Sequence, residues 1–274
     1  MNFFKSFLAS VLGTVVAFIF IGLLLMMSVA GIATAISSED SISVDISENS
    51  LLELDLDIPM FDNVGATQDI EQALGLGEDV LKYYDVIRAI RKAAKDDRIK
   101  GIDLQAQFPS MGWSQAQGIH KALQDFKAEG KFIYAYGDYF SQKGYYIASV
   151  SDSIFLHPMG GMEFKGLAAE VLYYKDFQEE YGFKMEVVRH GKYKSAVEPY
   201  LESEMSEANR TQISSLLNSV WENISEAIAT GRNLTTTQLN EIANGLKATQ
   251  PEHAQANGLI DALAYESDYD DKLK

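Results

Sequence analysis

Hydrophobic and polar positions alternate at two different periods through most of the chain, after an apolar run at the N-terminus. Alternation by twos predicts strands, and apolar residues at steps of three and four predict helices. The predicted strands span residues 51–57, 99–105, 131–136, 153–156 and 185–188. The predicted helices span residues 81–95, 114–129, 142–150, 168–181, 206–232, 236–243 and 251–257, with a last small element at 259–263. This alternation indicates an α/β domain with mostly parallel strands.

The N-terminal apolar run is long enough to cross a membrane. No charged residue occurs from Ser6 to Ser38, and a helix needs about 20 apolar residues to span a bilayer. Lys5 precedes the run and acidic residues follow it, so the positive-inside rule places the N-terminus in the cytoplasm. A cleaved signal peptide is the alternative, because residues 33–35 resemble a cleavage site. Apolar regions of signal peptides usually have about 7–15 residues, which favours a retained anchor here.

The chain is therefore expected to have five segments. They are a cytoplasmic N-terminus (1–5), a transmembrane anchor (6–35), an exposed linker rich in Ser, Glu and Asp (36–50), the α/β domain (51–265) and an acidic, mobile tail (266–274).

The composition excludes several kinds of partner and site. The 274 residues carry a formal net charge of −16, which repels phosphate backbones, so we expect no nucleic acid partner. The sequence has no cysteine, which excludes disulfides, thiol nucleophiles and cysteine-bound metal. Its four histidines (His120, His157, His190 and His253) do not pair at a metal-binding spacing, so we expect no histidine-bound metal.

Residues 190–199 are the strongest candidate for chemistry. They follow the predicted buried strand 185–188, and Gly191 lets the backbone leave that strand in a conformation that other residues avoid. Lys192 and Lys194 then lie on the same side of an extended chain. A lysine desolvated at such a strand end has a lowered pKa and becomes a possible general base. The alternative is that both lysines are solvated surface charges, which is the commoner state of lysine.

Other catalytic motifs do not fit the sequence. Gly191-Lys192 lacks the earlier glycine and the following Ser or Thr of a phosphate-binding loop. No G-x-S-x-G motif of a Ser-His-Asp hydrolase occurs, and the carboxylates are too scattered to propose an acid/base pair from spacing.

Four stretches resemble bacterial signal peptide peptidase A, also called protease IV. Residues 191–199, Gly-Lys-Tyr-Lys-Ser-Ala-Val-Glu-Pro, are similar to the G-x-Y-K-S-A-V-E-P motif of that family. Residues 96–102, 141–149 and 257–263 are similar to other parts of its N-terminal half. The resemblance implies a Clp protease/crotonase-like fold behind one transmembrane helix, and no cofactor. In the long form of the family two such halves lie in tandem, the first supplying a lysine general base and the second a serine nucleophile.

By this resemblance Lys194 is the general base, and the chain corresponds to the first half only. A Ser-Lys dyad needs a neutral amine close to the hydroxyl, which predicts a buried lysine with a depressed pKa. The nucleophile motif of the family is Ser-Gly-Gly-Tyr, and Gln142 stands where its serine would be. Ser141 is one residue off, about 100° away on a helix. Residues 109–112 replace the family's Ser-Pro-Gly-Gly segment, so the chain alone is expected to be inactive.

Two functional hypotheses follow. The first is a membrane-anchored Ser-Lys endopeptidase that degrades cleaved signal peptides and other apolar peptides. By resemblance its partners are the serine half and further copies, as a tetramer. The protein would cross the bacterial inner membrane once and carry its domain on the periplasmic side. The second is a non-catalytic, anchored module that binds peptides or acts as a scaffold through the apolar stripe from Ile213 to Ile228. A crotonase-type acyl-CoA enzyme is disfavoured, because no basic site for nucleotide phosphates is evident.

Overall fold

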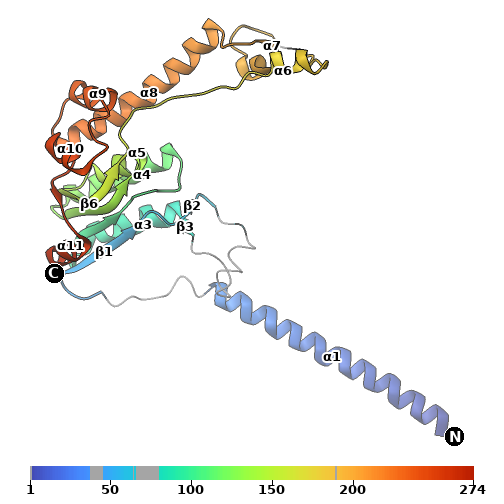
Figure 1. Ribbon diagram of the computed structural model, residues 1–274. Coiled ribbons are helices and arrows are strands. Elements are labelled where there is room, and N and C mark those ends of the chain that lie inside the picture. Colours follow the sequence, from blue (N-terminus) through green and yellow to red (C-terminus); the bar gives the residue numbers. More distant parts are fainter. Residues whose placement is uncertain (1, 38–45, 64, 66–79, 189) are drawn as a thin grey trace.

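In the computed structural model, a long N-terminal helix stands apart from an α/β domain (Figure 1). The structure describes residues 2–37, 46–63, 65, 80–188 and 190–274. Helix α1 (Asn2–Ser37) contains the 29-residue segment Phe3–Gly31, which is long and apolar enough to cross a membrane. None of that segment is buried against the rest of the chain. A helix that is apolar on all sides and packs on nothing is suited to a lipid environment, since its backbone groups are satisfied internally.

The domain is built on a five-stranded parallel sheet with the strand order β1-β4-β5-β6-β7. Its strands are β1 (Ser50–Asp55), β4 (Ile99–Gln105), β5 (Phe132–Phe140), β6 (Ser153–Met162) and β7 (Ala262–Leu263). A separate short parallel pair joins β2 (Met60–Phe61) to β3 (Leu81–Lys82). The predicted α/β class with parallel strands is therefore confirmed.

Helices lie between and after these strands. They are α3 (Tyr83–Lys95), α4 (Trp113–Ala128), α5 (Gln142–Ala148), α6 (Lys175–Glu180), α7 (Glu198–Leu201), α8 (Glu207–Arg232), α9 (Thr236–Asn244), α10 (Pro251–Ala256) and α11 (Glu266–Leu273). A single 3₁₀ turn, η2 (Ser195–Val197), precedes α7.

The core forms where α4 and the following helices cover the central strands. Ile102 and Leu104 on β4 and Ile133 on β5 are fully buried, as are Ile119 and Leu123 on α4. The apolar residues of β4 are buried and Lys100 between them is exposed, and this pattern of apolar and polar positions located the strand correctly. The α5 segment is almost entirely buried, so the polar residues at its start lie inside the domain.

Strand β6 runs further than predicted. The sequence prediction stopped it at residue 156 because of Pro158, but the strand continues to Met162. Pro158 is tolerated because β7 pairs only with Phe155 and Leu156, and the pairing with β5 is irregular between Gly137 and Tyr139. Neither neighbouring ladder therefore needs the missing N–H of the proline.

The predicted helix 168–181 is reduced to the short α6, and the predicted strand 185–188 is not formed. Residues 167–188 and 190–217, which include α6, η2, α7 and the first part of α8, form an arm that points away from the sheet (Figure 1). Val188 is fully exposed, and no described strand lies beside residues 185–188. An apolar run becomes a buried strand only where a sheet edge receives it, and here the arm carries it away from the sheet.

The prediction of a mobile tail is also wrong, because residues 266–273 form helix α11. Tyr269 on this helix is 3 % exposed and stacks on Tyr136 with ring centroids 5.1 Å apart. Its hydroxyl donates a 2.5 Å hydrogen bond to Oδ1 of Asp103 on β4. One buried aromatic thus fixes a segment whose composition is otherwise that of a solvated tail.

Tyr269→Ala is expected to lower the free energy of unfolding by about 3 kcal/mol, because it removes a buried ring and leaves the Asp103 carboxylate without this partner. Tyr269→Phe keeps the ring and loses only the hydrogen bond, so it should cost about 1 kcal/mol. Thermal unfolding of the detergent-solubilised protein measures both. If neither variant lowers the free energy of unfolding measurably, α11 does not pack on the sheet.

Candidate active site

The predicted general base, Lys194, lies on the arm, directly before η2 and α7. Its backbone N–H donates to the carbonyl of Gly191 at 3.3 Å, closing a turn in which Gly191 has φ +91°. Glycine adopts this left-handed conformation without the strain that a side chain would add. The side chain of Lys194 is exposed, so its predicted burial is not found. The reason is structural: the strand that was expected to bury it is absent.

Two polar residues that the sequence analysis did not single out hold this loop together. Glu198 is 1 % exposed, and its carboxylate accepts a 2.5 Å hydrogen bond from the hydroxyl of Ser206 at the start of α8. Gln178 on α6 is 4 % exposed; its amide donates to the carbonyl of Tyr200 at 2.9 Å and accepts from Met185 N at 2.8 Å. The glutamate of the lysine motif therefore has a structural role here, joining α7 to α8. No signal in the sequence pointed to this role, because the burial of Glu198 and its contact with Ser206 come from the fold.

The position that corresponds to the nucleophile in the resemblance lies at the start of α5, inside the domain. Gln142 is 8 % exposed, and its Oε1 accepts hydrogen bonds from the backbone N–H groups of Lys165 at 3.0 Å and Gly166 at 2.8 Å. Its Nε2 donates to the carbonyl of Gly166 at 2.9 Å. The amide thus clamps the chain where it leaves β6 for the arm. A carboxamide is no nucleophile, so this position has no catalytic hydroxyl.

Ser141, the neighbouring hydroxyl, is committed to a different task. It is the N-cap of α5, and its Oγ accepts a 3.1 Å hydrogen bond from Gly144 N. An N-cap serine satisfies one of the free N–H groups of the first helical turn. That Ser141 does not replace the absent nucleophile stays a prediction.

Lys143 is a second lysine at this position, which sequence reasoning did not select. Its Nζ donates to the carbonyl of Met111 and lies 5.8 Å from the ring centre of Trp113. Partial burial lowers the pKa of Lys143 below its usual value. The side chain therefore binds the 109–112 segment to α5.

The backbone N–H groups after β4 are also engaged. Asp57 Oδ1 accepts from Phe108 N at 2.6 Å, and its Oδ2 accepts from Gln107 N at 3.1 Å. Burial raises the pKa of Asp57, while these two hydrogen bonds act in the opposite direction. Donors that face a carboxylate of the chain itself are not available to stabilise an oxyanion. In the described structure, Asp57 therefore engages the N–H groups of Gln107 and Phe108.

One histidine is buried in this part of the domain. His120 on α4 is 3 % exposed, its Nε2 has no hydrogen-bond partner among the described residues, and its ring stacks on Tyr146 at 4.7 Å. Burial lowers the pKa of His120 to about 4. No group of three or more His, Asp or Glu side chains that could hold a metal occurs in the part of the chain that the structure describes.

The low pKa of His120 predicts a loss of stability in mild acid. The unfolded chain takes up a proton near pH 6.5, but the folded chain does so only near pH 4, so the free energy of unfolding falls as the pH drops between these values. The total loss is about 3 kcal/mol, and His120→Phe should remove it. Unfolding midpoints from pH 7 to pH 4 test this, with His253→Gln on the exposed face of α10 as the control. A slope unchanged in His120→Phe would contradict the assignment.

Comparison with known proteins places the chain in a family. The sequence pattern of peptidase family S49 matches residues 125–274. Protease 4 of Haemophilus influenzae is 32% identical over 268 residues, which cover 93% of this chain and 43% of that protein. Protease 4 of Salmonella typhi is 33% identical over 213 residues (74% of this chain, 34% of that protein). The chloroplastic serine protease SPPA of Arabidopsis thaliana is 30% identical over 185 residues (67% and 27%).

Among solved structures, a ClpP1 point mutant from Listeria monocytogenes is similar over 82% of this chain and 94% of its own, with a TM-score of 0.43 and 11% identity. An enoyl-CoA hydratase/isomerase from Marinobacter aquaeolei is similar over 70% of this chain and 63% of its own, with a TM-score of 0.40 and 13% identity. The chain spans less than half the length of the protease 4 relatives that it matches. On the sequence matches, the chain belongs to peptidase family S49, the family of protease 4 and signal peptide peptidase A.

Proposed function

We propose that the chain is the lysine-bearing half of a membrane-anchored Ser-Lys endopeptidase in which Lys194 is the general base. The observation that carries the proposal is a mismatch within the chain. The lysine motif at residues 191–199 is complete, whereas the nucleophile position holds Gln142, hydrogen-bonded to the backbone of Lys165 and Gly166. A chain that keeps the base and lacks the hydroxyl needs a second polypeptide segment to supply the serine.

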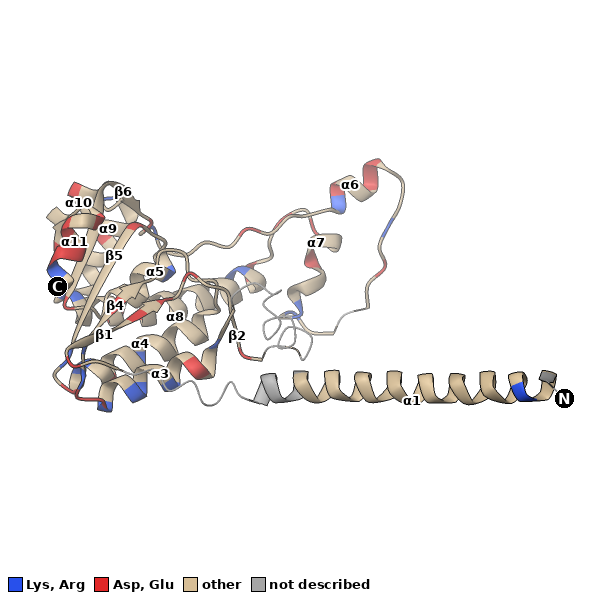
Figure 2. Ribbon diagram, turned by 90° about the horizontal axis from the view of Figure 1, so that it is seen from below, with Lys and Arg blue, Asp and Glu red and all other residues tan. Residues whose placement is uncertain are grey.

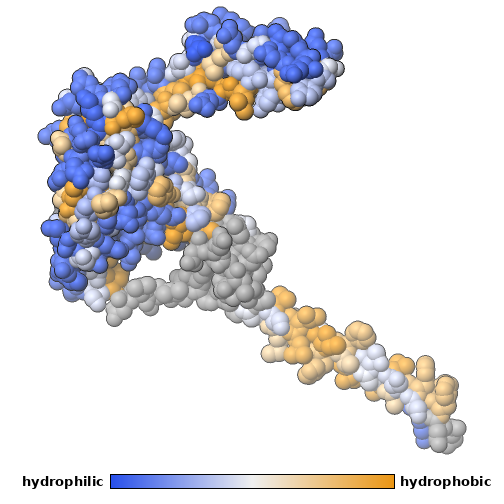
Figure 3. All heavy atoms as spheres, in the orientation of Figure 1, coloured by the Kyte–Doolittle hydropathy of each residue, from blue (hydrophilic) through white to orange (hydrophobic). Residues whose placement is uncertain are grey.

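The exposure of the arm supports this reading. Large apolar side chains are exposed on it, and Figure 3 shows hydrophobic atoms along its lower side. They include Leu172, Phe177, Tyr181, Phe183, Met185, Val188 and Leu216. Apolar surface of this extent marks an interface with another protein surface. The serine half and further copies of the protein are the partners we propose for it, and their contact would bury Lys194 and lower its pKa.

Apolar peptides, including cleaved signal peptides, are the proposed substrates, and the bacterial inner membrane the proposed location. Helix α1 would remain as a single span with Lys5 on the cytoplasmic side, and the domain would lie outside. A protease held at the membrane surface would meet apolar peptides where they leave the bilayer.

The test is hydrolysis of an apolar fluorogenic peptide by this chain alone and after addition of the serine half. We expect no turnover by the chain alone and turnover by the mixture that stops when the serine is replaced by alanine. Turnover by the chain alone would contradict the proposal, since none of its described hydroxyls is paired with Lys194.

A non-catalytic, anchored peptide-binding module is the second candidate. It is favoured because the side chains of Gln142, Lys143 and Asp57 are hydrogen-bonded to backbone groups of the chain itself. Only the second half of the apolar stripe on α8 is buried, through Ile224 and Ile228, whereas Leu216 is exposed and free to bind. Saturable binding of the peptide without turnover, even with the serine half present, would support this candidate over the first.

A further inference from the structure

Positive charge is concentrated on one helix of an otherwise acidic protein. Residues 82–100 contain seven lysines and arginines and three aspartates, although the whole chain has a net charge of −16. Arg88, Arg91, Lys92 and Lys95 are exposed along α3, and we name them the basic face. Figure 2 shows several Lys and Arg residues in blue along the lower edge of the domain, beside the label of α3. The basic face lines an open depression together with Tyr84, Ile87, Asp96 and Asp97, so four cations and two carboxylates surround it.

Local pairing does not account for this cluster. Arg88 forms an ion pair with Asp85 at 2.9 Å. For the side chains of Arg91, Lys92 and Lys95, the described part of the chain contains no ion pair or hydrogen bond. Lys92 and Lys95 lie in the last turn of α3, where a cation interacts favourably with the helix dipole. Arg88 and Arg91 lie earlier in the helix and gain nothing from that effect.

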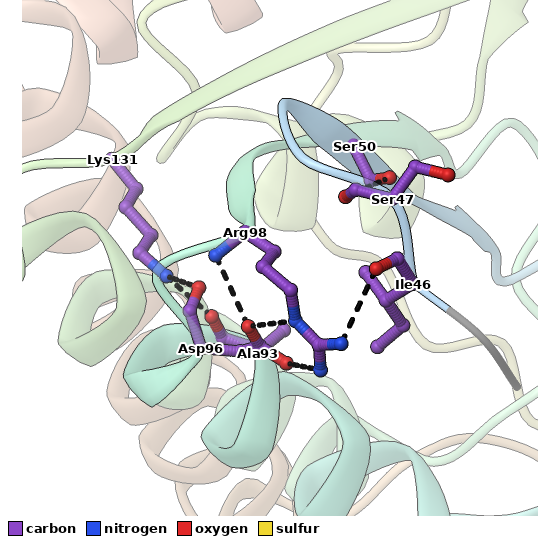
Figure 4. Close-up of polar contacts among 7 residues, drawn as sticks. All are labelled: Ile46, Ser47, Ser50, Ala93, Asp96, Arg98 and Lys131. Atoms are coloured by element: carbon purple, nitrogen blue, oxygen red, sulfur yellow. Dashed lines mark hydrogen bonds and ion pairs between the residues drawn. The ribbon is translucent and has the colours of Figure 1, made fainter. Parts of the chain in front are cut away.

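The segment that leads from α1 into the domain is fixed at the end of the same helix. Arg98 Nη1 donates to the carbonyl of Ile46 at 3.2 Å, and its guanidinium is held by Asp96 at 2.7 Å (Figure 4). Ser50 N donates to the carbonyl of Arg98 at 2.9 Å. Lys131 Nζ donates to the carbonyl of Asp96 at 2.7 Å, joining the same turn to β5. The chain therefore enters the domain directly beside the C-terminal end of the basic face.

The covalent link limits how far this end of α3 can lie from a membrane that α1 crosses. Nine residue steps separate Ser37, the last residue of α1, from Ile46, so the two are at most about 30 Å apart. Charges interact with a surface over about 8–10 Å at physiological ionic strength. The tether is longer than this range, so it keeps the basic face near the bilayer and permits contact with the surface, while the acidic remainder of the domain is repelled by an anionic surface.

We propose that the basic face of α3 binds the headgroups of anionic phospholipids in the bilayer that α1 crosses. Tyr84, which is 68% exposed beside Arg88, is placed to enter the interface, where tyrosine is enriched. This contact holds α3 against the membrane and so fixes both the orientation of the domain and the direction in which the arm points. The inference rests on the proposed anchoring by α1, and the experiment separates the two.

The absence of cysteine allows one labelled site at a time. The full chain carries Ala89→Cys, an exposed position on α3, with a fluorophore, and is reconstituted into vesicles that contain a headgroup-attached quencher. One set is phosphatidylcholine alone, and the other has equal parts of phosphatidylcholine and phosphatidylglycerol. The matched label is Ala256→Cys, an exposed position at the end of α10. Flotation of the vesicles reports anchoring separately.

Quenching at position 89 is expected to be about threefold stronger with phosphatidylglycerol than without it, because each cation gains from the negative surface potential. It should fall to the level of position 256 in about 1 M salt, where screening acts within about 3 Å. The double variant Arg91→Glu/Lys92→Glu should also reach that level while still floating with the vesicles. Equal quenching in both lipids overturns the proposal. The proposal also fails if, in phosphatidylcholine alone, quenching at position 89 decreases as the protein density rises. That result would assign the basic face to contacts between copies. Failure to float overturns the anchoring instead.

Discussion

Replacing Lys194 by methionine in protein that contains both halves is expected to lower the rate of peptide hydrolysis by a factor of about 10²–10⁴. Methionine matches the length of the lysine stem without an amine, so a serine hydroxyl loses its proton acceptor. The fold should survive, because the Lys194 side chain makes no hydrogen bond to the residues that the structure describes. Initial rates with a fluorogenic peptide and the unfolding midpoint are the two measurements.

Lys192 provides the matched control for this experiment. It lies two residues earlier on the same exposed loop, and its Nζ is 5.0 Å from the ring centre of Tyr193. Lys192→Met changes the charge of the loop as Lys194→Met does, and should leave the rate within about twofold, since a surface charge contributes little. A similar loss in both variants would show an effect of loop charge, and full activity of Lys194→Met would remove Lys194 from the mechanism.

Gly144→Ala is expected to destabilise the domain by about 3 kcal/mol or more, the upper range for forcing atoms into a packed interior. A Cβ at this position would overlap the carbonyl oxygen of Ala106 and lie 2.7 Å from that of Gln107. Both contacts are backbone atoms that cannot rotate away. The start of α5 would have to shift, and with it the hydrogen bonds of Gln142 to Lys165 and Gly166.

Gly112→Ala is the control in the adjoining loop. Its built Cβ meets only Gln115 Oε1, at 3.6 Å, and Gly112 has φ −73°, which suits any residue. Because alanine is a poorer N-cap than glycine, a cost of about 0.5–1 kcal/mol is expected. Thermal unfolding and backbone hydrogen exchange at residues 165–166 report both variants. If Gly144→Ala costs no more than Gly112→Ala, α5 does not approach the end of β4 this closely.

The periodic part of the sequence predicted the sheet and most helices within a few residues. Strand β4 was predicted at residues 99–105 and begins and ends there, because its apolar residues are buried between more open polar positions and a polar turn precedes it. Helix α8 was predicted at 206–232 and spans Glu207–Arg232. Local pattern and tertiary packing agree in these elements, so the pattern alone is sufficient.

The arm and the tail could not be predicted in the same way, since their structure depends on contacts far along the chain. Residues 185–188 have the composition of a buried strand, but no sheet edge is available to them. Residues 266–273 have the composition of a solvated tail, but one tyrosine binds Asp103, which lies 166 positions earlier. Amino-acid composition predicts neither the missing sheet neighbour of residues 185–188 nor the contact of Tyr269 with Asp103.

At the candidate site, sequence reasoning found Lys194 and the replacement at Gln142, but not the interactions of Gln142. The hydrogen bonds to Lys165 and Gly166 and the contact of Lys143 with Met111 join segments more than 20 residues apart. The lysine motif was recognisable because its residues are adjacent in sequence. The role of Glu198 required the position of Ser206, which only the fold provides.

The sheet has a consequence for how the protein is made. Its last strand, β7, pairs with β6 across about a hundred residues, and Asp261 accepts from Ile154 N at 2.8 Å across the same gap. During synthesis α1 is made before the sheet, and the edge of β6 stays open until residues 262–273 have been translated. Contacts this distant form slowly, and open strand edges bind other chains. Under the proposed topology, the nascent domain therefore crosses the membrane unfolded and depends on chaperones for protection until its C-terminal residues arrive.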